Sequence, residues 1–294
     1  MVVNEVTEEN IAPVRAFLED NSETALFLLS DLLAYGSRLG DDMNSGNYKS
    51  VESGGEVQGV FCLTRRGNLL VETGGRTDFA QRIVDACIAE PIAIRGVIGE
   101  WCSAVAVWQI LCESGSFVEE YRSREILYRL DLCPDHVSAT GVTGVRQLVP
   151  DDLTQWEPLR AAYLVEEGLP LQGTADQRRI NFEQNARAGC WWGYLDDDHL
   201  VTTAALNAVY KMTGQVGGVY TAPHWRRRGL ARSTMRGLIS DCFRLHGLQR
   251  LILFTGETNH VARRLYESLG FIQIGEVALL FGSAPGIEAG KSHA

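Results

Sequence analysis

The chain has 294 residues, 45% of them hydrophobic and 22% charged, with a formal net charge of −10. This length is typical of two domains with separate cores, and the composition excludes a disordered chain. The acidic balance disfavours nucleic acid and anionic membranes as partners, and no apolar run approaches the roughly 18 residues of a membrane span.

The acidic segment 1–10 does not resemble a signal peptide, so we expect a cytoplasmic protein. The seven cysteines form an odd count with no CxxC pair, which favours buried thiols over disulfides. The six histidines include no HxH or HxxxH pair, so we expect no metal site.

The first half predicts an alternation of strands and helices. A short strand precedes an amphipathic helix that places Ile11, Val14, Phe17 and Leu18 on one face. In chain order we then expect a helix at 23–36, strands at 48–53, 57–63 and 68–75, a helix at 79–90, a strand at 92–100, a helix ending near 116 and a strand at 124–132.

The second half follows the same order after a Pro-, Gly-, Ser- and Thr-rich linker at 133–143. A short strand at 145–149 leads through Pro150 into a helix that Asp151 or Asp152 opens. We then expect a helix at 174–189, a hairpin at 190–210 that turns at Asp196–Asp198, a strand at 213–222, a helix at 228–247, a strand at 249–255, a helix around 265–270 and a strand at 271–281.

Two similar segments support this repeat: LYESLGF at 265–271 and LCESGSF at 111–117 lie 154 residues apart. The order of elements, written twice, predicts an α/β chain of two domains. We expect these domains at 1–132 and 144–282, with a flexible tail at 283–294.

The segment 219–235 predicts an anion site. Arg226, Arg227 and Arg228 crowd a turn before a helix expected to begin at Gly229. The first turn of a helix presents unpaired N–H groups and the positive end of the dipole, so three arginines are unfavourable there unless a negative group compensates. The pattern indicates a polyanion such as a pyrophosphate; the alternative is an exposed basic turn. Neither a Walker loop nor a GxGxxG fingerprint is present.

Two motifs carry a family resemblance. Residues 226–231, RRRGLA, resemble the R/Q-x-x-G-x-G/A acyl-CoA loop of the GNAT acetyltransferase superfamily, and NHVARRLYESLGF at 259–271 is similar to its second signature. The resemblance covers about 143–282, and LFTGETNHVARRLYESLGF is similar to the glycine N-acyltransferase-like branch. It implies two tandem GNAT-like domains, each a mixed central sheet flanked by helices. It also implies an N-acetyltransferase that moves an acetyl group from acetyl-CoA to the amine of a small molecule or amino acid by direct transfer.

The resemblance also implies roles for individual residues. Backbone groups of Val219, Tyr220 and Thr221 are expected to hold the pantetheine arm, and Asn259 to hydrogen-bond it. Tyr266 is expected to protonate the leaving thiolate as a general acid. The pyrophosphate is expected at the loop formed by Arg226, Arg227, Arg228, Gly229, Leu230 and Ala231.

The first half lacks these signatures. The offset of 154 maps Tyr266 to Cys112 and Asn259 to Val105, and only Arg76 stands before the corresponding helix. We therefore expect a degenerate copy that packs on the second half and shapes the acceptor cleft. Cys112 is interpreted as a core cysteine rather than a reactive thiol.

Amine acetylation needs a base, and the candidates are Glu157, Glu166, Glu167 and Glu257. Glu166 and Glu167 lie where the family builds its acceptor pocket; all four are also compatible with surface glutamates. Trp191 and Trp192 are neighbours in an expected strand, so their side chains point to opposite faces of the sheet. At least one of them therefore faces outward, where it could form an aromatic wall of the acceptor site.

Two alternatives remain at this point: an amino-acid N-acyltransferase that uses a longer acyl-CoA, and a non-catalytic acyl-CoA-binding regulatory module. The expected partners are acetyl-CoA and an amine-bearing small molecule or peptide, without nucleic acid or membrane. We expect a monomer or a homodimer.

Overall fold

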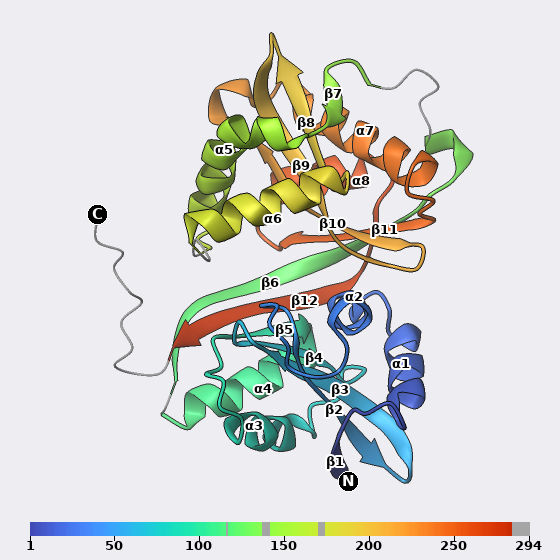
Figure 1. Cartoon of the computed structure of the whole chain (residues 1–294), viewed down its shortest axis with the longest axis vertical. Helices are drawn as coiled ribbons and strands as arrows, with labels where there is room; N and C mark the ends of the chain where they lie inside the picture. Colours follow the sequence, from blue (N-terminus) through green and yellow to red (C-terminus); the bar gives the residue numbers. More distant parts are fainter. Residues whose placement is uncertain (116, 137–141, 170–173, 284–294) are drawn as a thin grey trace. The chain divides into compact units, whose positions relative to one another are not determined.

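The strands and helices of the computed structural model follow the order that the sequence predicts (Figure 1). The structure describes residues 1–115, 117–136, 142–169 and 174–283; much of the expected linker and nearly all of the expected tail lie outside these ranges. The described chain divides into two compact units. Unit 1 contains Met1–Leu127, Thr255–Thr258 and the chain from Ile274, and unit 2 contains Tyr128–Phe254 and Asn259–Gln273.

Unit 1 is a mixed sheet with helices. Its elements are β1 (Val2–Glu5), α1 (Ile11–Asp20), α2 (Leu26–Tyr35), β2 (Gly46–Ser53), β3 (Glu56–Thr64), β4 (Asn68–Glu72), α3 (Ala80–Ile88), β5 (Gly96–Glu100), α4 (Trp101–Glu113) and most of β6 (Val118–Asp131). The first four strands pair antiparallel in sequence order, and β4 pairs parallel with β5. Large buried side chains fill its core, among them Phe61, Phe79 and Trp108.

Unit 2 repeats this pattern. Its elements are β7 (Val145–Gln147), α5 (Leu153–Glu166), α6 (Ala175–Arg187), β8 (Trp191–Asp196), β9 (His199–Tyr210), β10 (Thr213–Thr221), α7 (Leu230–Arg244), β11 (Arg250–Gly256) and α8 (His260–Glu267). Strands β7 to β10 pair antiparallel in order, and β10 pairs parallel with β11.

The last strand of each half contributes residues to the unit that the other half forms. Strand β12 (Ile272–Ser283) follows α8 in the chain but pairs antiparallel with β5 in unit 1, from Val277 opposite Glu100 to Phe281 opposite Gly96. Conversely, the end of β6 belongs to unit 2 and lies beside β11. Each compact unit is therefore completed by a strand that the other half of the chain encodes.

The two tryptophans of β8 face opposite sides of the sheet in unit 2. Trp191 packs edge-on against Trp156 of α5 and lies tilted against Phe182 of α6, whereas the indole of Trp192 donates to Asp241 of α7 at 2.9 Å. Alternation along a strand explains this division, since successive side chains point to opposite faces. Helices cover both faces, so both tryptophans are core residues and neither is exposed to solvent.

The hairpin between β8 and β9 offers a test of the turn chemistry. Asp197 and Asp198 have φ angles of 44° and 64°, the left-handed conformation that both central residues of a type I′ turn adopt. Because glycine reaches this region without the strain of a Cβ, we expect Asp198→Gly to stabilise the fold by about 0.5–1 kcal/mol. Urea unfolding followed by circular dichroism measures it. Asp196→Gly, two residues earlier and inside β8, is the control and is expected to destabilise.

Candidate functional site

The sheet of unit 2 opens between its two parallel strands. Residues Thr213–Val216 of β10 pair with Arg250–Leu253 of β11, and among the described residues this pairing ends there. From Gly217 to Thr221, β10 continues to pair only with β9 on its other side. The backbone of β10 facing β11 is therefore left without a strand partner, and an extended ligand can pair with such an edge.

A bulge in β10 accompanies this opening. The register with β9 shifts between Gly217 and Tyr220, and Gly218 has a φ of 59°. Thr203 donates its hydroxyl to the carbonyl of Gly218 at 3.1 Å, which holds the bulge from the β9 side. Bulges are common next to active sites because they re-aim the chain.

The loop that follows β10 has the geometry of an anion site. Arg227 and Gly229 have φ angles of 63° and 79°, on either side of Arg228. Gly229 precedes the first residue of α7 and carries no side chain to cap it, so the N–H groups of Leu230, Ala231 and Arg232 lack acceptors within the helix. A non-glycine residue held left-handed costs about 1–3 kcal/mol, and such strain concentrates at functional sites. The anion site expected at this turn stays a prediction.

The three arginines of the loop differ in their contacts. Arg226 donates to a carboxylate oxygen of Glu166 at 2.6 Å and to the carbonyl of Thr221 at 2.9 Å. The guanidinium of Arg228 lies over the ring of Trp225, 4.8 Å from its centroid. Arg227 is exposed and has no ionic or hydrogen-bonding partner among the described residues. Glu166 thus partly compensates the positive charge beside the start of α7. The sequence did not reveal this pairing of Glu166 with Arg226.

Glu166 and Glu167 have different environments at the end of α5. Glu166 is about half exposed and paired with Arg226. Glu167 is partly buried, and burial followed by repulsion from Glu166 raises the pKa of its carboxyl. Of the other two candidate bases, Glu157 lies 3.9 Å from Arg178 and Glu257 lies 3.9 Å from Arg124. Burial thus moves the pKa of the Glu167 carboxyl toward neutral pH.

Helix α8 carries the remaining two predicted site residues. Asn259 is its N-cap, and the side-chain oxygen accepts from the N–H of Ala262 at 3.1 Å. The amide NH₂ of the same side chain is the half that can donate to a ligand. Tyr266 is 6% exposed and its ring packs against Phe271.

A residue from the first half of the sequence reaches this helix. Tyr128, in the part of β6 that belongs to unit 2, packs its ring 6.3 Å from that of Tyr266. Its hydroxyl donates to Glu267 at 2.9 Å and accepts from Arg263 at 3.0 Å. Sequence analysis missed Tyr128 because its partners lie about one domain length away along the chain.

Sequence analysis also missed Arg160, although a local signal was present. Arg160 lies four residues after Trp156 and four before Leu164, both buried, and thus on the core-facing side of α5. An arginine in the apolar stripe of a helix is a pattern that the sequence alone displays.

Residues 154–271 match the Acetyltransferase (GNAT) family. The match includes the β10–β11 opening, the arginine loop and α8. The matched residues lie almost entirely within unit 2. Comparison with curated proteins gave no match.

Solved structures with the same fold cover nearly the whole chain. A Drosophila protein aligns with a TM-score of 0.68 at 13% identity, over 97% of this chain and 99% of its own. A GCN5-related N-acetyltransferase from Sphaerobacter thermophilus aligns with a TM-score of 0.61 at 17% identity, over 97% and 96%. A GNAT-family acetyltransferase from Colwellia psychrerythraea gives 0.54 at 12%, over 96% and 100%. The predicted fold, two tandem GNAT-like domains with mixed sheets flanked by helices, is confirmed. The glycine N-acyltransferase-like branch stays a prediction.

The corresponding positions of unit 1 carry different chemistry. The single arginine before α3, Arg76, is held by both oxygens of Asp78. Glu100 rather than an asparagine caps α4, and it accepts from the N–H groups of Cys102 and Ser103. Burial raises the pKa of the Cys112 thiol, which disfavours a thiolate nucleophile. A negative charge thus occupies the helix start that in unit 2 is capped by a neutral side chain.

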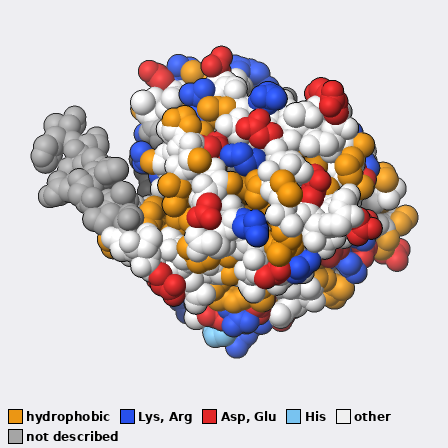
Figure 2. Space-filling view, turned by 90° about the horizontal axis from the view of Figure 1, so that it is seen from below, with side chains coloured by type: hydrophobic (Ala, Val, Ile, Leu, Met, Phe, Trp, Pro, Cys, Tyr) orange, Lys and Arg blue, Asp and Glu red, His pale blue; other side chains and the backbone are white. Residues whose placement is uncertain are grey.

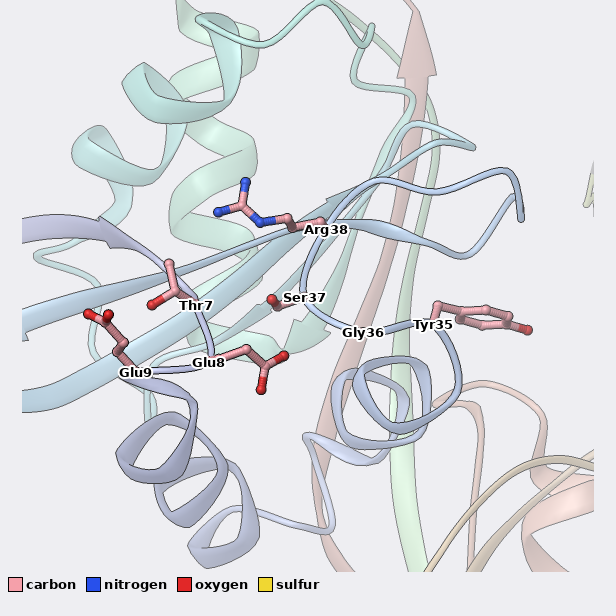
Figure 3. A pocket seen from close by; sticks show the side chains of 7 residues that line it. All are labelled: Thr7, Glu8, Glu9, Tyr35, Gly36, Ser37 and Arg38. Atoms are coloured by element: carbon pink, nitrogen blue, oxygen red, sulfur yellow. The ribbon is translucent and has the colours of Figure 1, made fainter.

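Unit 1 also has a cavity of about 510 Å³ between the β1–α1 turn and the end of α2 (Figure 3). Its lining combines Glu8 and Glu9 with Arg38, and the Tyr35 ring points away from the other labelled side chains. On the face in Figure 2, positive, negative and apolar side chains are interspersed. Within the described residues, no cluster of His, Cys, Asp and Glu suits a metal ion and no helix has the length and apolarity to cross a bilayer.

The environment of Glu167 predicts a pH-dependent stability effect. A carboxyl whose pKa is raised by folding favours the folded state below its ordinary pKa of 4.5 and loses that contribution as the pH rises through the folded value. Glu167→Gln is therefore expected to raise Tm at about pH 8, with a gain that shrinks toward about pH 4. Thermal unfolding across this range measures it. Glu157→Gln, on the same helix, is the control; a gain from Glu167→Gln that is constant with pH contradicts the assignment.

Proposed function

We propose that unit 2 is an N-acetyltransferase that moves an acetyl group from acetyl-CoA directly to an amine. The observation that carries this proposal is the opening between β10 and β11 after Val216, which leads along the chain to the uncapped start of α7 at Leu230. An extended thioester arm fits a strand edge, and a pyrophosphate fits a helix start. The match of residues 154–271 to a family of acetyltransferases supports the same assignment.

The residues divide into groups that hold different parts of acetyl-CoA. Backbone groups of Val219, Tyr220 and Thr221 would pair with the pantetheine arm and the acyl carbonyl, and the NH₂ of Asn259 would donate to the arm. The loop from Arg226 to Ala231 would hold the pyrophosphate through its N–H groups. Arg227 would supply a positive charge to the pyrophosphate, because it forms no hydrogen bond or ion pair with the described residues.

The chemistry needs one proton removed and one supplied. The neutral amine attacks the acetyl carbonyl, the carbon–sulfur bond breaks, and the thiolate leaves. Glu167 takes the proton that the attacking nitrogen loses, directly or through a water, because its raised pKa makes it a better base near neutral pH than an exposed glutamate. Tyr266 protonates the departing sulfur. Glu166 acts through Arg226, which it holds against the end of β10.

Unit 1 is proposed to lack this activity. Its arginine is paired with Asp78, which reverses the feature that attracts a polyanion in unit 2, and Glu100 caps α4 where unit 2 has Asn259 to donate to the pantetheine arm. The cytoplasmic location, the oligomeric state and the division at 1–132 and 144–282 stay predictions.

Loss of charge from the anion loop is expected to weaken acetyl-CoA binding. The double variant Arg227→Gln/Arg228→Gln removes two of its three cations, and we expect Kd to rise at least about tenfold, since each charge-assisted hydrogen bond contributes about 1.5–3 kcal/mol. Calorimetric titration measures the affinity. The matched control is Arg236→Gln/Arg244→Gln, two exposed arginines of later turns of α7. Equal affinities of both double variants would remove the loop from the binding site.

Removal of the Tyr266 hydroxyl is expected to slow the reaction without affecting donor binding. Tyr266→Phe keeps the ring contacts with Tyr128 and Phe271, and kcat should fall about 10²-fold, the range of a lost general acid. Release of free CoA measures turnover, and Tyr210→Phe in β9 is the control. Unchanged turnover rules Tyr266 out as the acid. Turnover that is low in every variant, with acetyl-CoA still bound, favours the non-catalytic binding module.

A further inference from the structure

Arg160 is a cation on the covered side of unit 2. It is partly buried between Trp156 and Leu164 along α5, and these neighbours are 6% and 9% exposed. Burying a charge is costly unless a partner compensates, so arginines on such a face are normally paired.

No described residue forms a hydrogen bond or ion pair with Arg160. Its only recorded interaction is with the ring of Tyr163, whose centroid lies 5.0 Å from Cζ. Burial lowers the pKa of its guanidinium, and Tyr163 alone opposes that shift. Four other arginines of the unit have carboxylate partners: Arg146 with Asp152, Arg178 with Glu157, Arg179 with Glu183, and Arg226 with Glu166. Arg227 and Arg228, which have no carboxylate partner among the described residues, are exposed to solvent, whereas Arg160 is partly buried.

The guanidinium lies at the bulge of β10. A Cβ built on Gly218 would be 3.6 Å from Nη1 of Arg160 and 3.2 Å from the ring of Trp191. Gly218 directly precedes the residues 219–221 that would hold the acyl carbonyl. The ring of Tyr163 reaches the same stretch, since it packs edge-on against Tyr220 at 6.1 Å. The guanidinium of Arg160 thus lies beside Gly218, the residue of β10 that directly precedes the proposed reaction centre.

We propose that Arg160 binds a carboxylate of the reacting molecules, and that the acceptor is an amino acid whose amine and carboxylate are close together. The inference rests on the proposed acetyl transfer. An unpaired, partly buried guanidinium is preorganised for a carboxylate, because the bound anion supplies the charge that the protein omits. The same carboxylate can also come from the donor, as the terminal group of a dicarboxylic acyl chain, and the experiment separates these sources.

The test compares molecules that differ only in the carboxylate. Glycine, alanine, phenylalanine and glutamate are each paired with the corresponding α-amide, with acetyl-CoA as donor and free CoA as the readout. We expect at least one amino acid to exceed its amide by about 30-fold in kcat/KM. Arg160→Gln should abolish that ratio, whereas Arg179→Gln, an exposed arginine of α6, should leave it unchanged. Arg160→Lys should restore part of the ratio.

A second arm exchanges the donor. Acetyl-CoA and succinyl-CoA are titrated into the full chain and into Arg160→Gln by calorimetry. A preference for succinyl-CoA that Arg160→Gln removes assigns the carboxylate to the donor and overturns the amino-acid acceptor. In the same experiment the CoA-saturated chain is titrated with the N-acetyl derivatives of the four amino acids and with their amides, so that binding is read without turnover.

The outcomes separate this inference from the proposed function. If acetyl-CoA does not bind, the proposed function fails and the inference fails with it. If acetyl-CoA binds and no acceptor or product pair shows a preference that depends on Arg160, only the inference is overturned.

Stability gives an independent readout. Arg160→Met replaces an unpaired charge by an apolar chain of similar length and should raise Tm by roughly 2 °C while carboxylate selectivity is lost. A fall in Tm indicates that Arg160 is a structural residue and contradicts the assignment.

Discussion

The end of the β10–β11 pairing at Val216 is the constraint on which the proposed site depends. Two parallel strands that stay paired leave no room for a ligand between them, whereas here β10 keeps only its β9 partner from Gly217 onward. The bulge at Gly218 and the hydroxyl of Thr203 hold β10 in this course. The anion loop is a direct continuation of the same strand, so the opening and the helix start are aligned by the chain itself.

Charge pairing distinguishes the arginines of unit 2 by function. Arg226 is fixed by Glu166 and by the carbonyl of Thr221, which ties the loop to the end of α5. Arg227 and Arg160 lack such carboxylates among the described residues. Arg160 is partly buried, so its uncompensated charge costs stability, and this cost is recovered when an anionic ligand binds. In unit 1, by contrast, Asp78 pairs with Arg76, which is consistent with the proposal that this half lacks a polyanion site.

The exchange of final strands makes the two halves interdependent. Strand β12 completes the sheet of unit 1, and the end of β6 brings Tyr128 to α8 in unit 2. The hydroxyl of Tyr128 links Arg263 to Glu267 on that helix, and its ring contacts Tyr266. The half of the sequence without the acyl-CoA motifs thus contributes directly to the surroundings of the proposed acid.

The sequence by itself determined the order of the elements, the repeat, the hairpin turn at Asp197–Asp198 and the two motifs around Gly229 and Asn259, because each depends on local periodicity, turn chemistry or capping. The tertiary structure decided which atoms meet. The pairing of Glu166 with Arg226, the approach of Tyr128 to Tyr266 and the strand exchange all join residues far apart in the chain, for which no local pattern exists. Arg160 combines both kinds of information. Its position among the core-facing residues of α5 can be read from the sequence, but only the folded chain shows that no carboxylate of the described residues pairs with it.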